Sequence, residues 1–168
     1  MTPSSAAITL RLGRMGDLDA LVALEKAVFT YDVLSRRSFR RFLASPGATL
    51  IVANQDGSLA GYVLVLYPPR SNIARLYSIL VAPHIGGRGV GPLLLGAAER
   101  AACRHGRRVM RLEVHEHNTR AIARYEKSGY RLIGRLREYY DDHRDAFRFE
   151  KPLDARGRRR SVKGTRRP

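Results

Sequence analysis

The sequence has a single cysteine and no long apolar run among its 168 residues. One thiol, Cys103, cannot form a disulfide framework or a thiolate zinc site within one chain, and we expect it to be a buried or half-buried side chain. No segment approaches the roughly 18 apolar residues that a membrane-spanning helix needs. Residues 1–5 lack the charged and then apolar stretch of an export signal. These absences predict a cytoplasmic protein without membrane contact.

Acidic residues are also scarce, with 15 Asp and Glu against 31 Lys and Arg, so the formal net charge is +16. Residues 156–168 hold seven of the basic residues and no acidic one, which leaves nine net positive charges for the rest of the chain. This segment has too few apolar side chains to join a core. We therefore expect one domain at residues 1–155 and a disordered extension at residues 156–168. The extension either contacts RNA or a ribosome weakly or only aids solubility.

The most informative pattern is a strand that leads through a glycine-rich turn into a helix. A β-branched and aromatic run at residues 76–81 precedes Gly86-Gly87-Arg88-Gly89-Val90-Gly91, and an alanine- and leucine-rich segment at residues 93–102 follows. The first N–H groups of a helix have no intrahelical acceptor, its dipole favours an anion there, and glycines allow close backbone approach. The pattern predicts a phosphate-binding site, although a plain turn before a helix would look the same.

The glycine spacing distinguishes between kinds of phosphate-binding loop. A Walker-type loop ends in Gly-Lys-Ser/Thr, whereas Val90-Gly91-Pro92 follows Gly89, so a nucleoside triphosphatase is not expected. A dinucleotide-binding loop needs a third glycine, and residues 87–92 supply only Gly-x-Gly.

A second motif, Asn-x-x-Ala-x-x-x-Tyr-x-x-x-Gly-Tyr, runs from Asn118 to Tyr130. Together with Gly86-x-x-Gly89-x-Gly91, it resembles the GCN5-related N-acetyltransferase (GNAT) superfamily, whose acetyl-coenzyme A loop reads Gln/Arg-x-x-Gly-x-Gly/Ala. The Leu-Glu-Val run at residues 112–114 and the later Tyr139-Tyr140 resemble the ribosomal-protein alanine N-acetyltransferases of the RimI type. The resemblance covers residues 7–153.

Periodicity predicts strands at residues 8–12, 48–53, 59–66, 73–81, 107–115, 130–137 and 144–151. Helices are predicted after Asp17, Ser35 and Asn118, which can act as N-caps, and after the glycine loop. Strands and helices mixed in this way indicate an α+β fold with helices on both faces of a sheet. The resemblance implies a mixed, mostly antiparallel sheet of six to seven strands that splays into a V between strands 4 and 5.

The V implied by the resemblance would expose backbone groups that can pair with the pantetheine amides of acetyl-coenzyme A, the co-substrate. Its pyrophosphate would reach the glycine loop. Two departures from the family pattern are Gly86, where Gln or Arg is usual, and Pro92, which removes one N–H. Asn118 either contacts pantetheine or only caps a helix. The expected cofactor-binding residues are Ile79, Leu80, Val81, Gly86, Gly87, Arg88, Gly89, Val90, Gly91 and Asn118.

The resemblance also implies catalytic residues. An α-amino group titrates near pH 8 and a lysine near pH 10.4, so acetyl transfer to either one benefits from a base. Glu113 would take this role through water, unless it is an ordinary solvated glutamate. Tyr125 would protonate the departing sulfur, unless it only fills the core.

The acceptor site is predicted around Tyr139 and Tyr140, which either wall a channel or anchor a hairpin. Asp141, Asp142 and Asp145 add negative charge that could hold a cationic acceptor. The nearby histidines lack further ligands at metal-site spacing, so no metal is expected.

These residues predict an acetyl-coenzyme A-dependent N-acetyltransferase that uses direct transfer in a ternary complex. The favoured acceptor is a protein or peptide N-terminal α-amine, a ribosomal one among the possibilities. The alternatives are a small-amine or lysine acetyltransferase of the same fold, and a non-catalytic coenzyme A-binding protein that docks on RNA.

Overall fold

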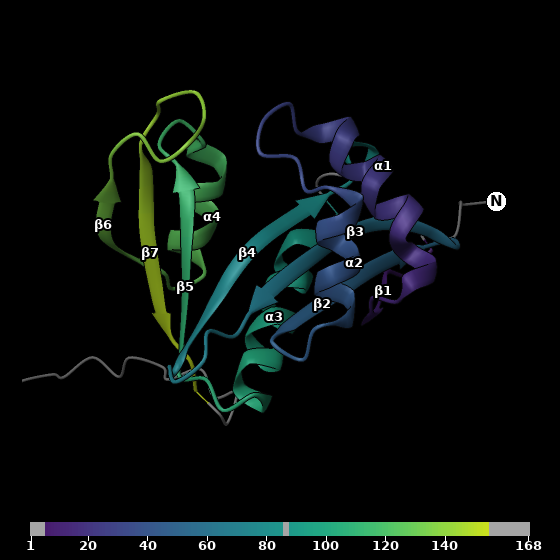
Figure 1. Cartoon of the computed structure of the whole chain (residues 1–168), viewed down its shortest axis with the longest axis horizontal. Helices are drawn as coiled ribbons and strands as arrows, with labels where there is room; N and C mark the ends of the chain where they lie inside the picture. Colours follow the sequence, from purple (N-terminus) through teal and green to yellow (C-terminus); the bar gives the residue numbers. More distant parts are fainter. Residues whose placement is uncertain (1–5, 86–87, 155–168) are drawn as a thin grey trace, which may run out of the picture.

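The computed structural model describes residues 6–85 and 88–154. Within these ranges, seven strands form one sheet in the order β1-β2-β3-β4-β5-β7-β6 (Figure 1). Only β4 and β5 pair in parallel, and every other neighbouring pair is antiparallel. The predicted α+β fold with a mixed, mostly antiparallel sheet is thereby confirmed. The predicted extension at residues 156–168 lies outside the described residues.

The observed elements follow the predicted order. The strands are β1 (Thr9–Leu12), β2 (Ala48–Gln55), β3 (Ser58–Leu66), β4 (Ile73–Val81), β5 (Val109–His115), β6 (Arg131–Leu136) and β7 (Ala146–Pro152). The helices are α1 (Leu18–Val28), α2 (Arg36–Ala44), α3 (Val90–Arg104) and α4 (Thr119–Lys127), with short 3-10 turns at Met15–Asp17 and Pro83–Ile85.

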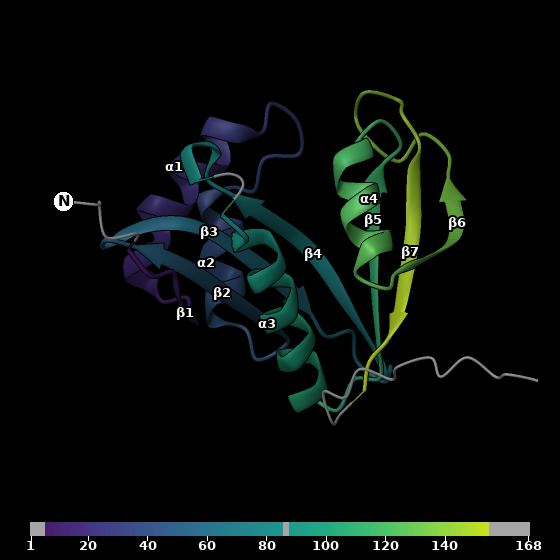
Figure 2. The same cartoon turned by 180° about the vertical axis from the view of Figure 1, so that it is seen from behind.

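Two hydrophobic cores lie on opposite faces of the sheet, because successive strand residues point to opposite sides. Leu50 and Val52 of β2 pack with α1 and α2, whereas Ile51 and Ala53 belong to the core with α3. Figures 1 and 2 show α1 and α2 in front of the sheet and α3 and α4 behind it. Helices thus cover both faces, as predicted.

Local capping and turn chemistry explain most element boundaries. The Ser35 side chain accepts a hydrogen bond from the Ser38 N–H at the start of α2, as a helix cap should. The β2–β3 turn is only Asp56-Gly57, with positive φ at both residues, so both strands extend further than predicted. Asp17 precedes α1 but does not cap it, because its carboxylate accepts from Arg11 and from the Arg14 N–H.

The sheet opens between β4 and β5. Their parallel pairing consists of Ile73–Val109, Ala74–Met110 and Arg75–Arg111. Beyond Arg75, β4 follows β3 while β5 follows β7, so the two strands diverge toward the top of Figure 1. The predicted V is therefore present, and from Leu76 to Val81 one edge of β4 pairs with no other described strand.

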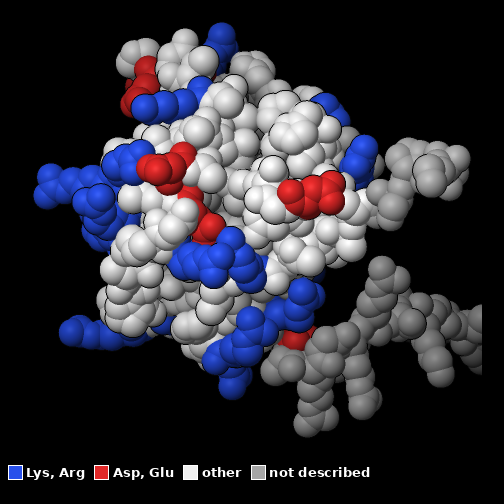
Figure 3. Space-filling model, turned by 90° about the vertical axis from the view of Figure 1, so that its right-hand side faces the viewer, with Lys and Arg blue, Asp and Glu red and all other residues white. Residues whose placement is uncertain are grey.

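Charged side chains are unevenly spread over one face of the molecule. Figure 3 shows separate groups of basic side chains among larger uncharged areas, with a few acidic side chains beside them. Positive charge on this face is therefore interrupted by negative charge.

Among the described residues, no helix has the length and apolar character needed to span a membrane.

The close approach of β3 to β4 at Gly61 gives a stability prediction. A Cβ atom at Gly61 would lie 2.5 Å from the backbone oxygen of Leu80, and backbone cannot move aside as a flexible side chain can. We expect Gly61→Ala to lower the free energy of unfolding by about 1–3 kcal/mol, measured by urea denaturation. Gly134→Ala in β6 is the control, because a Cβ atom there meets no atom within 4 Å. Equal stability of the two variants would contradict this explanation.

Candidate active site

The free edge of β4 forms one side of the candidate site. Ile79, Leu80 and Val81 pair with β3 through Val63, Tyr62 and Gly61, so only their other edge is open. Leu80 is buried against the α1 and α2 side, while Ile79 and Val81 pack against the core with α3. Side chains therefore lie above and below this edge, and the backbone faces the opening between β4 and β5. An extended amide chain could add there as a further strand.

The N-terminus of α3 lies at the end of the same strand. Gly89 precedes the helix with φ of 75°, a left-handed conformation that glycine adopts without strain. Val90 and Gly91 are buried, and Arg88 is exposed. The N–H groups of Val90 and Gly91 have no acceptor within the helix, which suits an anion. Gly86 and Gly87, also predicted to bind the cofactor, lie outside the described residues.

Glu113 of β5 is buried and paired rather than solvated. Its neighbours Leu112 and Val114 point into the α3 core, so the Glu113 side chain points to the other face of the sheet. The side chain is 6% exposed. Its Oε1 accepts a hydrogen bond from Arg148 Nε at 3.0 Å, and its Oε2 lies 3.1 Å from Arg75 Nη2. Two guanidinium groups thus hold the carboxylate in one place.

Tyr125 of α4 is a buried residue whose hydroxyl has no hydrogen-bond partner among the described residues. Its ring meets that of Tyr130 edge-to-face, with 5.7 Å between centroids, and the residue is 6% exposed. Its hydroxyl makes no hydrogen bond to any residue in the described ranges. Burial raises the pKa of Tyr125 to about 12, although the charge of Arg124 acts in the opposite direction. The hydroxyl is therefore protonated at neutral pH and free to donate.

The loop between β6 and β7 brings the predicted acceptor residues to the same opening. The Tyr139 hydroxyl accepts a hydrogen bond from Arg75 at 2.7 Å, and the Tyr140 ring packs against His115. Burial raises the pKa of Tyr140, and Tyr139, Glu113, Asp32 and Tyr125 raise it further. Groups that act on one hydroxyl must lie near it. Arg75 contacts both Glu113 and Tyr139, and the charges of Glu113 and Tyr125 act on the Tyr140 hydroxyl, so these four predicted residues lie in the same part of the molecule.

Asp32, in the loop between α1 and α2, reaches toward the acidic residues of the β6–β7 loop. Burial raises the pKa of Asp32 first, and a hydrogen bond with Asp141 and the charges of Asp141 and Asp142 raise it further. Figure 1 shows these two loops facing each other above the opening. Asp142 also lies 2.8 Å from His115 Nε2, a hydrogen bond that lowers the pKa of Asp142. Two of the three predicted aspartates therefore lie at the mouth of the opening.

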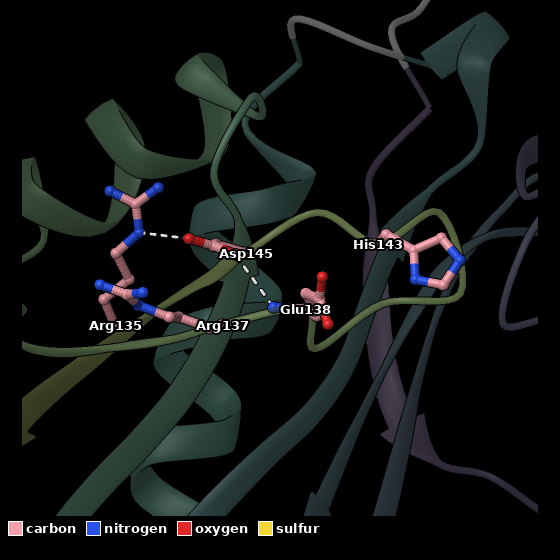
Figure 4. Close-up of a pocket in the computed structure, with 5 residues that line it drawn as sticks. All are labelled: Arg135, Arg137, Glu138, His143 and Asp145. Atoms are coloured by element: carbon pink, nitrogen blue, oxygen red, sulfur yellow. Dashed lines mark hydrogen bonds and ion pairs between the residues drawn. The ribbon is translucent and has the colours of Figure 1, made fainter.

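Asp145, the third predicted aspartate, has a different role. Its carboxylate accepts from the Glu138 N–H at 2.9 Å and pairs with Arg135, as Figure 4 shows. These contacts fix the loop and neutralise the charge. An open hollow of about 660 Å³ beside them is lined by Arg135, Arg137, Glu138, His143 and Asp145, and it contains no predicted catalytic residue.

Asn118 caps α4, because its side-chain oxygen accepts from the Ala121 N–H at 3.2 Å. This contact does not test the predicted cofactor contact, since the exposed amide group has further hydrogen-bonding capacity. His115 and His117 pack against each other. Among the described residues, no group of three or more His, Cys, Asp or Glu side chains is arranged to hold a metal ion.

Sequence reasoning missed the residues that support the site from a distance. Glu25 of α1 is 1% exposed, and its carboxylate accepts from the Tyr62 hydroxyl at 2.6 Å and from the Leu34 N–H at 3.1 Å. Burial raises the pKa of Glu25. The Leu34 contact fixes the loop that carries Asp32. Glu25 continues the buried stripe of Leu18, Leu21 and Val22 at helical spacing, so the periodicity does carry a signal for this buried carboxylate.

Arg75 and Arg148 were also missed, although strand alternation carries a signal for them. Both lie on the face of the sheet that Glu113 occupies, and Arg148 is directly opposite Glu113 in the β5–β7 register. Finding them requires the register between strands far apart in the sequence, which periodicity alone does not supply.

Comparisons with known proteins identify relatives of this chain. Residues 18–130 match the model of the acetyltransferase (GNAT) family. The N-alpha-acetyltransferase RimI of Mycobacterium tuberculosis is 32% identical over 145 residues, which cover 83% of this chain and 89% of that protein. An N-alpha-acetyltransferase of Saccharolobus solfataricus is 29% identical over 160 residues, covering 86% and 93%. The crystal structure of the ribosomal-protein-S18-alanine N-acetyltransferase from Escherichia coli has a TM-score of 0.79 at 25% identity, covering 88% and 94%.

Proposed function

Because the chain belongs to the acetyltransferase (GNAT) family, we propose that this N-acetyltransferase moves the acetyl group of acetyl-coenzyme A to a protein N-terminal α-amine. Transfer is direct, within a ternary complex. The observation that carries the proposal is the shared opening. The free edge of β4 and the N-terminus of α3 border it, and Tyr125 of α4 acts on the hydroxyl of Tyr140 in the β6–β7 loop.

The opening suits an extended amide chain that ends in a diphosphate. Ile79 to Val81 would pair with the pantetheine amides, and the N–H groups of Val90 and Gly91 would bind the diphosphate. Arg88 adds positive charge beside them. Gly91 is buried, and a Cβ atom there would lie 2.9 Å from Arg124 Nη1, so the first turn of α3 has no room for a larger side chain at this position.

Glu113 and Tyr125 would handle the two protons of the reaction. The amine nitrogen attacks the thioester carbonyl carbon, a C–N bond forms and the C–S bond breaks. Glu113 takes the amine proton through a water molecule, since its own oxygens already face two guanidinium groups. The Tyr125 hydroxyl donates a hydrogen bond to the departing sulfur. A thiol titrates near pH 8.5, so the hydroxyl chiefly stabilises the thiolate as its charge develops.

The mouth of the opening suits a positively charged acceptor. Asp32, Asp141 and Asp142 bring carboxylates together, and a cation beside them relieves their mutual repulsion. Tyr139 and Tyr140 would flank the chain that follows the amine. The two relatives named N-alpha-acetyltransferases support an N-terminal acceptor, and the E. coli protein named for S18-alanine supports a ribosomal one.

Competing acceptors test the proposed function. Purified protein with isotopically labelled acetyl-coenzyme A should acetylate an alanine-first peptide with a free N-terminus. The same peptide with a blocked N-terminus and an internal lysine, and a polyamine, should react much more slowly. Mass spectrometry of the products locates the label. Acetylation confined to lysine or to the polyamine would contradict the N-terminal assignment, and no transfer to any acceptor would favour a coenzyme A-binding protein.

Tyr125→Phe should lower kcat by about 10- to 1000-fold, because the ring stays and the proton donor is lost. Acetyl-coenzyme A binding should survive. Tyr130→Phe removes a neighbouring hydroxyl that bonds to Glu99 and should keep kcat near wild type. The protonated form of Tyr125 is required, and its pKa is raised to about 12, so kcat should not fall as the pH rises from about 8 to 10. Unchanged turnover in Tyr125→Phe would exclude the role.

Glu113→Gln should lower kcat by about 100- to 10,000-fold at neutral pH if this carboxylate relays the amine proton. Glu150→Gln is a matched control, because Glu150 lies on the same sheet face and pairs with Arg111 at 2.7 Å. The control should retain activity. Coenzyme binding, followed by calorimetry, should be similar in both variants. Equal activity of the two variants would show that Glu113 acts only in the structure of the site.

A further inference from the structure

A buried carboxylate holds the loop between α1 and α2. This loop, residues 29–35, faces the β6–β7 loop above the opening and carries Asp32 (Figure 1). Within residues 30–34, only the backbone of Leu34 forms a hydrogen bond to another described residue, and its N–H donates to Glu25 Oε1 at 3.1 Å. The one backbone hydrogen bond that connects this stretch to the rest of the described structure therefore ends on Glu25.

Glu25 is itself fixed by hydrogen bonds that lead to β4. Its Oε2 accepts from the Tyr62 hydroxyl at 2.6 Å, and the hydroxyl oxygens of Tyr62 and Ser78 are 2.8 Å apart. Because the Tyr62 proton is directed at Glu25, the Ser78 hydroxyl donates to Tyr62. Ser78 directly precedes Ile79 on β4, whose free edge borders the opening. The loop is thus connected to one wall of the opening through the Glu25 carboxylate.

The burial of Glu25 is unfavourable by itself, because a carboxylate loses its hydration. The residue is 1% exposed, and burial raises its pKa. Only hydrogen bonds from Tyr62 and Leu34 act in the opposite direction, and no cation among the described residues pairs with it. The other buried residues of α1 are apolar. An apolar residue of similar volume can replace a buried charge without loss of stability, so core stability alone does not explain this carboxylate.

We propose that Glu25 is a positioning residue for the acceptor, because through the Leu34 N–H it holds Asp32 where that carboxylate meets the cationic amine. This inference rests on the proposed function, in which Asp32 is part of the mouth of the opening. Glu25 is too deeply buried to touch the acceptor or the coenzyme. Its loss therefore weakens acceptor binding and leaves coenzyme binding unchanged.

Steady-state kinetics with an alanine-first peptide tests the proposal. Glu25→Leu removes a hydrogen bond to a charged group, so it should raise KM for the peptide about 10-fold while kcat changes less than about threefold. The Kd of coenzyme A, measured by calorimetry, should stay at the wild-type value. Glu25→Gln keeps an oxygen for the Leu34 N–H and should restore a KM near that of the wild type.

Thr49→Val is the matched control for a lost buried contact. The Thr49 hydroxyl accepts from the Tyr67 hydroxyl at 2.8 Å, and both residues are buried. Thr49 lies on β2, which does not border the opening. This variant also removes a buried acceptor of a tyrosine hydroxyl, and its KM for the peptide should equal that of the wild type.

A double-mutant cycle with Asp32→Asn tests whether Glu25 acts through Asp32. Asparagine tolerates the positive φ of 53° at this position, so the loop conformation is kept. The double variant should have a KM close to that of either single variant, because removal of the carboxylate leaves nothing for Glu25 to position. Multiplied effects of the two changes, or a wild-type KM in Glu25→Leu, would overturn the inference.

Hydrogen exchange on the wild-type protein tests the Leu34 contact without a variant. The Leu34 N–H should exchange more slowly than the amides of residues 30–33, and exchange as fast as theirs would overturn the inference even where Glu25→Leu does not fold. Failure of the proposed function looks different. If the wild type acetylates only lysine or a polyamine, the same cycle tests Glu25 with that cationic acceptor. No transfer to any acceptor would contradict both proposals.

Discussion

The parallel pairing of β4 with β5 stops after Arg75 and Arg111. The rest of the site depends on the separation of the two strands beyond this point. A β-strand in the middle of a sheet has both edges satisfied, whereas β4 beyond Arg75 has one edge satisfied by β3 and one open. Burial of Leu80 on one face and packing of Ile79 on the other hold the strand in place without a second neighbour. Exposed backbone donors and acceptors can therefore persist as a binding surface.

Arg75 lies where β4 and β5 separate, and it connects β4 with β5 and with the β6–β7 loop. From the last paired position of β4 it reaches Glu113 of β5 and the Tyr139 hydroxyl of the β6–β7 loop. Because Arg148 holds the other oxygen of Glu113, the carboxylate is fixed from both sides of the split. Only the Glu113 side chain is largely buried here, at 6% exposed, whereas the Arg75 and Arg148 side chains are 36% and 33% exposed, so two partly solvated cations offset the burial of one carboxylate. The site is thus built across a gap that backbone hydrogen bonds do not close.

The sequence predicted the fold and the family well because both depend on local patterns. Strand alternation, the Ser35 cap and the turn at Asp56-Gly57 act over a few residues, and the glycine loop and the Asn118–Tyr130 motif mark the family that the comparisons show. Sequence reasoning failed where long-range register decides the outcome. Arg75 and Arg148 acquire their contacts with Glu113 only through the pairing of strands that are far apart in the chain. Asp145 is a case of another kind, because local contacts with Arg135 and the Glu138 N–H already engage the carboxylate that was expected to hold the acceptor.

The ionisation of the acceptor itself favours an α-amine over a lysine side chain at this site. At pH 7.4, about a fifth of α-amino groups with a pKa near 8 are neutral, against about 0.1% of lysines with a pKa near 10.4. A base that must deprotonate lysine needs free access to the ammonium group. The Glu113 side chain is 6% exposed, and its oxygens already face two guanidinium groups. It therefore suits the relay of a proton through water from an α-amine, about a fifth of which is neutral when it binds. Under the proposed function, the same pairing that fixes Glu113 in the split sheet would therefore favour N-terminal amines over lysine side chains.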